Sequence, residues 1–182
     1  MTVESIHFTI SLAEPADAAE IAALGGNVFF ESFAYSMPAE DMDQYLKTSY
    51  STQRIETEIQ DTHTYLFYTA RDDSTNQLLG FVQLNRFSQE PCLEIKPPNT
   101  IELQRIYTDS NAHSRGVGSK LMSQALGYAT ENGYQAIWLG VWEENLKAQK
   151  FYMQRHHFKK VGVHDFTMGS CVQTDWILER RL

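Results

Sequence analysis

Cysteines are scarce in this sequence, and long apolar segments are missing. Only two cysteines occur among the 182 residues, Cys92 and Cys171, and they lie far apart without a CxxC motif or a Cys/His spacing. Isolated cysteines of this kind indicate reduced thiols rather than a disulfide or a metal site. No run of about 18 apolar residues is present, so we expect no transmembrane helix.

The sequence also lacks a secretion signal and an excess of basic residues. The N-terminal segment MTVESIHFTISLAEPADAAE has acidic residues early and no basic start followed by a long apolar core. We therefore expect a cytoplasmic protein, with access to the nucleus left open. Lys and Arg number 15 against 23 Asp and Glu, which gives a net charge of −8. Because nucleic-acid binding relies on a dense basic face, this charge argues against a nucleic-acid partner.

Acidic residues are concentrated in one segment of the chain. Residues 14–61 contain ten acids and two bases, Lys47 and Arg54. Such a surface could steer a cationic small molecule towards the protein through its long-range field. A solvated helical surface produces the same pattern, so both interpretations stay open.

The hydrophobic pattern predicts a single domain, residues 1–182, of the α/β (α+β) class. Apolar runs predict seven strands, at residues 6–13, 64–70, 78–85, 101–108, 135–142, 159–168 and 171–181. Helices are expected from Pro15 to near Gly25–Gly26, as one or two helices within 28–60, and over 116–132 and 145–156. The order places a strand–helix–strand unit at the centre of a mixed sheet, and two hairpins make that sheet mostly antiparallel.

A glycine-rich loop, HSRGVGS at 113–119, lies between a predicted strand and a predicted helix. A dinucleotide fingerprint needs a third glycine where Leu121 stands, and the Gly-Lys-Ser/Thr of a nucleoside-triphosphate loop is also missing. What remains is a loop whose amides and helix dipole point at one spot, with Arg115 and Lys120 near by. The segment alone is compatible with an anion site or with an ordinary tight turn.

The run from Glu102 to Phe158 resembles the Gcn5-related N-acetyltransferase (GNAT) superfamily. Its acetyl-CoA motif, Gln/Arg-x-x-Gly-x-Gly/Ala, falls on 113–118, and its Asn-x-x-Ala-x-x-Phe-Tyr signature falls on 145–152. The segments ELQRIYT, WLGVWEEN, KAQKFY, GVHDF and QTDW are similar to bacterial PaiA-type polyamine (spermidine/spermine) N-acetyltransferases. Two positions depart from the pattern: His113 replaces Gln or Arg, and FYMQRHHF is one residue longer than usual, with His157 in place of a glycine.

The resemblance implies a GNAT fold, with acetyl-CoA as co-substrate and no metal. It assigns the pantetheine arm to the strand before the loop and the pyrophosphate to the loop amides. The residues it gives to the cofactor are Ile106, Tyr107, Thr108, Ser114, Arg115, Gly116, Val117, Gly118, Ser119, Asn145 and Ala148. Packing in the strand and a helix cap at Asn145 are the structural alternatives for these residues.

Tyr152 is the predicted general acid that protonates the leaving thiolate. Asn145, Ala148 and Tyr152 are spaced i, i+3 and i+7, which puts them on one face of a helix. A phenol pKa of about 10 is close enough to the thiol value of about 8.5 for proton donation. A tyrosine that simply packs in the core is the alternative.

Glu102 is the predicted base that takes the proton of the incoming ammonium group. Strand alternation places Glu102 with Gln104 and Ile106 on one face, and Leu103, Arg105 and Tyr107 on the other. A surface glutamate at a strand end is the alternative. Rival bases are Glu94, Glu143 and Glu144. The adjacent His156 and His157 point in different directions on a helix, which argues against chelation of a metal by this pair.

Together these features predict an acyltransferase, an acetyl-CoA-dependent GNAT N-acetyltransferase that transfers the acetyl group directly to its acceptor. Neither cysteine nor any serine stands in the setting of an activated nucleophile, so no covalent enzyme intermediate is expected. The predicted acceptor is a polyamine or another small cationic primary amine. Alternatives are the acetylation of a protein N-terminus or lysine, and a regulatory module that binds acetyl-CoA without catalysis. The oligomeric state stays open, although the C-terminal hairpin could pair across a two-fold axis in a homodimer.

Overall fold

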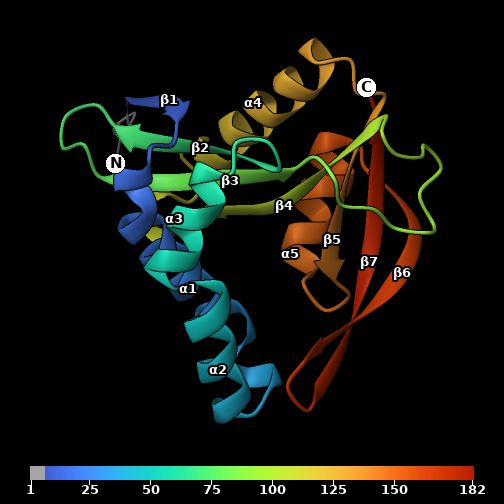
Figure 1. Ribbon diagram of the computed structural model, residues 1–182, viewed down its shortest axis with the longest axis horizontal. Helices are drawn as coiled ribbons and strands as arrows, with labels where there is room; N and C mark the ends of the chain where they lie inside the picture. The colour runs from blue at the N-terminus through green and yellow to red at the C-terminus, as the bar shows by residue number, and fades with distance from the viewer. Residues whose placement is uncertain (1–6) are drawn as a thin grey trace.

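The structure is a computed structural model that describes residues 7–182. Its strands form one seven-stranded sheet in the order β1-β2-β3-β4-β5-β7-β6 (Figure 1). They are β1 (Phe8–Leu12), β2 (Tyr65–Asp72), β3 (Leu78–Asn85), β4 (Thr100–Thr108), β5 (Ala136–Trp142), β6 (Lys159–Met168) and β7 (Cys171–Arg181). Among the strands of residues 7–182, β4 and β5 are the only neighbours that run parallel to each other. The predicted mixed, mostly antiparallel sheet is confirmed, although Ile6, the expected start of the first strand, lies outside the described residues.

Helices pack on both faces of the sheet. They are α1 (Ala18–Phe33), α2 (Ala39–Ser49), α3 (Thr52–Gln60), α4 (Val117–Glu131) and α5 (Leu146–Gln149), which continues into a π-helix (Lys150–Arg155). Ile21 of α1 and Ile55 of α3 pack in one core cluster with Phe81 of β3. Leu121 of α4 packs in another cluster with Val82, the next residue of β3. Neighbouring strand residues face opposite sides, so α1 and α3 cover one face and α4 the other.

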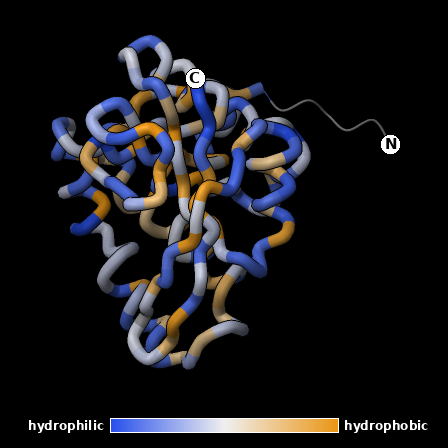
Figure 2. The backbone as a smooth tube through the Cα atoms, turned by 90° about the vertical axis from the view of Figure 1, so that its right-hand side faces the viewer, coloured by the Kyte–Doolittle hydropathy of each residue, from blue (hydrophilic) through white to orange (hydrophobic). Residues whose placement is uncertain are grey.

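The C-terminal hairpin of β6 and β7 agrees with its predicted bounds and joins the sheet through β5. Figure 2 views the molecule from this side and shows hydrophobic and hydrophilic residues alternating along the strands that face the viewer. The tip of the hairpin reaches α2, where Ser170 donates through its amide and its hydroxyl to the Asp41 carboxylate, at 3.0 and 2.7 Å. These hydrogen bonds therefore connect α2, near the start of the chain, to the hairpin at its C-terminal end.

The parallel strands β4 and β5 separate soon after they begin. Their ladder joins residues 100–102 to residues 136–138 and then ends. Beyond this point β4 continues to Thr108 and β5 to Trp142 without pairing to each other, and the two strands point in different directions (Figure 1). The edge of β4 that faces β5 consequently has backbone groups available for another partner.

The prediction that α1 fades near Gly25–Gly26 is wrong. The helix runs through both glycines to Phe33. A Cβ atom on Gly25 would lie only 2.8 Å from the ring of Tyr50. The glycine therefore allows the segment after α2 to pack closely against α1, and this packing outweighs the low helix propensity of glycine.

The predicted alternation along β4 is also wrong, because the strand contains a β-bulge. Leu84 pairs with Leu103 and Gln83 pairs with Arg105, so Gln104 has no opposite residue. The extra residue reverses the faces that follow it. Glu102 consequently shares a face with Arg105 and Tyr107 rather than with Ile106.

The helix expected over 145–156 is regular only at its start. After Gln149 the chain forms the π-helix, and His157 has a left-handed φ of 60°. A π-helix holds more residues per turn than an α-helix, and a single inserted residue is a common origin of such a segment. The π-helix thus accommodates the extra residue of FYMQRHHF, and His157 adopts the conformation that a glycine would favour.

Candidate active site

A cavity of about 1420 Å³ opens where β4 and β5 separate. It extends from α1 and Tyr45 of α2 to the start of α4. All but one of the residues predicted for the site line this cavity: Glu102, Ile106, Tyr107, Thr108, Ser114, Gly116, Val117, Gly118, Ser119, Asn145, Ala148 and Tyr152. Arg115 is exposed and is not among the lining residues. The structure therefore brings residues from three separate segments to one space.

The glycine-rich loop presents an open helix N-terminus to the cavity. Ser114 and Gly116 adopt left-handed backbone conformations, with φ of 63° and 87°. In the described part of the chain, no side chain caps the N-terminus of α4. Within residues 7–182, the amides of Gly116, Val117, Gly118 and Ser119 donate to no backbone carbonyl. Unpaired amides at the positive end of a 15-residue helix form a site that attracts an anion.

Basic side chains surround this end of the cavity, and sequence analysis did not identify them. Lys147 Nζ lies 3.4 Å from His113 Nδ1, and Arg155 Nη1 lies 3.4 Å from Ser119 Oγ. Lys150 also lines the cavity. These basic residues lie in the segment after Asn145, whereas the sequence suggested Arg115 and Lys120. Their spacing along that helical segment could have predicted that they lie near the loop.

The chain's residues at this end fit an elongated anionic ligand such as acetyl-CoA. Phosphate groups would meet the open amides and the bases, while the free edge of β4 offers N–H and C=O groups to the amides of the pantetheine arm. Ile106 and Thr108 lie in the part of β4 that does not pair with β5.

Asn145 caps the helix that follows it. Its Oδ1 accepts a hydrogen bond from the amide of Ala148 at 3.0 Å. The structural alternative for Asn145 is thus present in the molecule. This cap does not use the Nδ2 group of Asn145, so that group is available as a hydrogen-bond donor at the cavity wall.

Tyr152 lies on the wall of the cavity within the π-helix. Its ring packs against Phe151 and Phe158, with centroids 5.4 and 6.0 Å away. Burial raises the pKa of the Tyr152 phenol well above its usual range. No residue within 7–182 forms a hydrogen bond with its hydroxyl group. The tyrosine is therefore a protonated donor without a protein partner.

Glu102 carries a buried carboxylate oxygen, Oε2, that has no hydrogen-bond partner within residues 7–182. Burial raises the pKa of this carboxyl to about 7, against the opposing effects of the Ser88 hydroxyl and of the Arg105 charge. Such a group can accept a proton near neutral pH. Among the rival bases, Glu94 forms an ion pair with Arg181 at 3.0 Å, and Glu143 and Glu144 do not line the main cavity.

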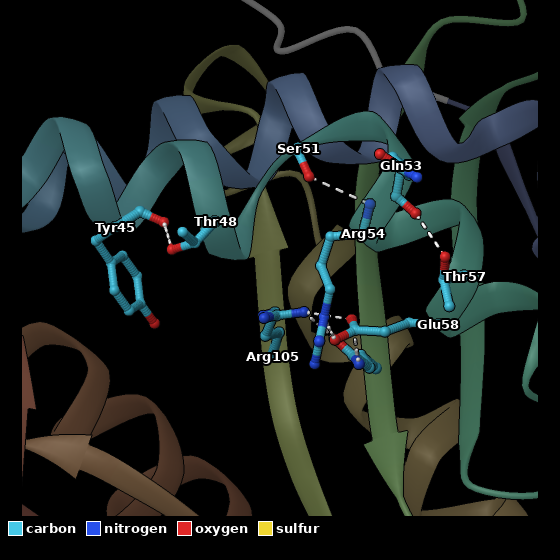
Figure 3. Close-up of polar contacts among 9 residues, drawn as sticks. Tyr45, Thr48, Ser51, Gln53, Arg54, Thr57, Glu58 and Arg105 are labelled. Atoms are coloured by element: carbon cyan, nitrogen blue, oxygen red, sulfur yellow. Dashed lines mark hydrogen bonds and ion pairs between the residues drawn. The ribbon is translucent and has the colours of Figure 1, made fainter.

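A buried ionic network behind the cavity fixes Arg105, and sequence analysis missed it. Glu58 accepts from Arg54 Nε at 2.6 Å and from Arg105 Nη1 at 2.9 Å (Figure 3). It also accepts from Gln83 Nε2 at 3.0 Å. The Arg105 guanidinium also lies 5.0 Å from the centroid of the Tyr50 ring. The pair of Arg54 and Glu58, spaced i, i+4, was visible in the sequence, but its link to β4 depends on the fold. Arg105 is consequently neutralised and held.

The acids that line the cavity are not those of the acidic segment 14–61. None of the ten lines it; for example, Asp17 and Glu20 bind Arg71, at 2.7 and 2.8 Å. The lining acids are Glu90, Glu102 and Asp175. They come from the loop after β3, from β4 and from β7. Because these segments are far apart in the sequence, a count of acidic residues along the chain does not predict that they meet.

Comparison with known proteins identifies the family of this chain. A family model described as the acetyltransferase (GNAT) family matches residues 31–158, more than half of the sequence. The chain belongs to the GNAT family. This GNAT protein is an acetyl-CoA-dependent N-acetyltransferase, as the resemblance of its motifs implied.

Relatives of this GNAT chain match it over nearly its whole length. An uncharacterized N-acetyltransferase of Lactobacillus delbrueckii subsp. lactis is 28% identical over 166 residues, which cover 91% of this chain and 92% of the relative. An uncharacterized N-acetyltransferase of Mycobacterium tuberculosis (strain H37Rv) is 26% identical, covering 91% and 98%.

Solved structures show the same fold. A PaiA N-acetyltransferase from Thermoplasma acidophilum, crystallised with coenzyme A, has a TM-score of 0.74 and 21% identity, covering 97% of this chain and 100% of its own. A GNAT protein from Rhodopseudomonas palustris has a TM-score of 0.72 and 12% identity, covering 100% and 99%. The predicted GNAT fold is thereby confirmed.

Within residues 7–182 no group of three or more His, Cys, Asp or Glu side chains is arranged to hold a metal ion. None of the helices in this part of the chain is both long and apolar enough to span a membrane.

Proposed function

We propose that this enzyme acetylates a small cationic primary amine, such as a polyamine, by direct transfer from acetyl-CoA. The observation that carries the proposal is the polarity of the cavity. Its loop end holds open amides with Lys147, Lys150 and Arg155, whereas its opposite part contains the carboxylates of Glu102 and Asp175. An anionic donor and a cationic acceptor would each meet the complementary charge, which favours productive binding of both.

Two residues supply the proton transfers in this proposal. Glu102 accepts a proton from the acceptor ammonium, which leaves a neutral nitrogen with a lone pair. That nitrogen forms the new C–N bond while the C–S bond of the thioester breaks, and Tyr152 donates its proton to the departing sulfur. The nitrogen, now positively charged, loses its second proton to give the neutral amide, and solvent carries this proton back to the Tyr152 phenolate. Solvent also removes the proton that Glu102 took up, so each turnover releases one proton. No group of the protein becomes acetylated.

The cofactor residues in the proposal are those of the loop and of the neighbouring strand edge. The amides of 114–119 would hold the pyrophosphate, and Ile106, Tyr107 and Thr108 would contact the pantetheine arm through backbone groups. Asn145 would donate through Nδ2 beside Ala148, whose small side chain leaves room for the arm. Arg115 would act at most through its charge, because its side chain lies outside the cavity wall.

The test is a turnover assay that follows release of free coenzyme A thiol from acetyl-CoA. The acceptors are spermidine, spermine, putrescine, monoamines, free amino acids and lysine-containing peptides. We expect thiol release with the cationic small amines and little with peptides. Preference for a peptide would refute the proposed acceptor class and leave the acetyltransferase activity intact. Absence of thiol release with every amine would refute the proposed function.

A further inference from the structure

Asp175 is a carboxylate without a partner in the wall of the cavity. It lies on β7, opposite Trp142 of β5 and His164 of β6. Within residues 7–182 its oxygens form no hydrogen bond and no ion pair. Burial raises the pKa of this carboxyl to about 6. A half-buried carboxylate in this state lacks the cation or the donors that such groups normally have.

Several other carboxylates of the protein are paired, in contrast to Asp175. Glu58 accepts from three side chains. Glu90 pairs with His164 at 2.9 Å. Glu179 accepts from the amides of Glu94 and Ile95, at 2.9 and 3.3 Å. Against this background the lack of a partner at Asp175 points to a ligand.

Aromatic rings surround the part of the cavity that contains Asp175. Tyr45 of α2 and Phe166 of β6 meet edge to face, with centroids 6.1 Å apart. Phe33 of α1 lies 5.3 Å from Trp142, the residue paired with Asp175. Burial raises the pKa of Tyr45, and the charge of Asp175 adds to this rise, so the carboxylate lies within electrostatic reach of that ring. A carboxylate among aromatic faces is suited to an alkylammonium group, which combines charge with an apolar chain.

We infer that Asp175, with the rings of Tyr45, Phe166, Phe33 and Trp142, forms a subsite for a second ammonium group of the acceptor. This inference rests on the proposed function, because it divides the acceptor between two carboxylates. Glu102 receives the amine that reacts, and Asp175 holds the charge at the far end of the molecule. Asp175 is thus a specificity-determining residue that selects diamines and longer polyamines over monoamines.

Spacing along the sheet supports two separate ammonium sites. Glu102 pairs with Trp138, whereas Asp175 pairs with Trp142, four residues further along β5. Four residues of a strand span about 13 Å, so the two carboxylates cannot bind the same nitrogen. The Oε2 atom of Glu102 is itself buried and has no partner within residues 7–182. This independently supports a cation-binding site at Glu102 in addition to the one at Asp175.

The experiment compares putrescine with butylamine, which has the same carbon chain and a single amino group. In Asp175→Asn the KM for putrescine should rise about 10- to 100-fold, the range expected for loss of a charge-assisted hydrogen bond. The kcat for putrescine should change little, and the KM and kcat for butylamine, which lacks the second ammonium group, should change far less than the KM for putrescine. Asp165→Asn is the matched control, because it removes the same charge from an exposed position on the same hairpin. It should leave all four constants unchanged.

Tyr45→Leu provides a second variant that keeps the charge. It should raise the KM for putrescine by a smaller factor and spare butylamine, since only the ring is lost. Equal effects of Asp175→Asn on putrescine and butylamine, or no effect on either, would overturn the subsite while the proposed function stands. Failure of the unmodified enzyme to acetylate any amine would overturn the proposed function and the subsite together.

Discussion

Replacement of Glu102 by glutamine tests the charge state on which the proposed base depends. Burial raises the pKa of the Glu102 carboxyl from 4.5 to about 7. Between these values the folded protein holds a proton that the unfolded chain has already lost. The folded state therefore loses stability as the pH rises through this window, and the loss is complete above the folded-state pKa. The difference between 4.5 and about 7 corresponds to about 3 kcal/mol of unfolding free energy.

Glu102→Gln removes the ionisable group and keeps the shape of the side chain. Relative to the unmodified protein, its unfolding temperature should be nearly unchanged at low pH and higher by about 6–12 °C above the folded-state pKa. The activity should change in the opposite direction, with kcat/KM lower by about 10²- to 10⁴-fold. The unmodified enzyme should also show a rise of kcat/KM with pH, with an apparent pKa near 7, that the variant lacks.

Thermal unfolding and thiol release, each measured across the pH range around 7, check both parts of this prediction. Glu94→Gln is a suitable control, because Glu94 is paired with Arg181 at the surface and lies outside the cavity wall. If kcat/KM of Glu102→Gln still rises with pH around an apparent pKa near 7, another group is the base. A gain in unfolding temperature that does not vary with pH would contradict the buried, ionisable carboxyl.

Three other substitutions test separate parts of the site. Tyr152→Phe should lower kcat by about 100-fold or more while acetyl-CoA binding, measured by calorimetry, stays unchanged, whereas unchanged turnover would exclude the phenol as the acid. Gly116→Val should strain a left-handed residue by about 1–2 kcal/mol and weaken acetyl-CoA binding in the same calorimetric measurement. Glu58→Ala should leave the buried Arg105 charge without its carboxylate partner, with the Gln83 amide oxygen, 2.6 Å away, as its remaining acceptor, at a cost of about 3–5 kcal/mol. That corresponds to an unfolding temperature lower by about 6–20 °C, and a small change in thermal unfolding would contradict the role of the network.

Local patterns were sufficient to predict most of the fold. The bounds of the C-terminal hairpin agree with the sequence because alternating residues and Gly169–Ser170 mark both strands and the turn. α1 was predicted too short because its passage through Gly25 depends on the ring of Tyr50, which arrives from a distant segment. The bulge at Gln104 leaves no local mark at all, since it exists only relative to the pairing of β3.

The candidate site divides in the same way. The loop and Tyr152 follow motifs of fixed spacing, so their positions could be predicted along the chain. Asp175 reaches the cavity because β7 pairs with β5, and Glu90 lies there in contact with His164 of β6. Both contacts join segments that are far apart in the sequence, so local patterns do not predict them. The basic residues near the loop belong to a helix whose later turns form a π-helix, and an α-helical wheel misplaces such residues.

The central claim is direct acetyl transfer to a cationic amine, and a single-turnover experiment read by mass spectrometry tests it most directly. Enzyme in excess over acetyl-CoA is mixed with spermidine, and the masses of the amine and of the intact protein are followed over time. The account predicts one monoacetylated spermidine for each acetyl-CoA consumed, with the mass of the protein constant throughout. Acetylated protein that forms before the product, or acetyl-CoA that remains intact beside spermidine, would contradict it.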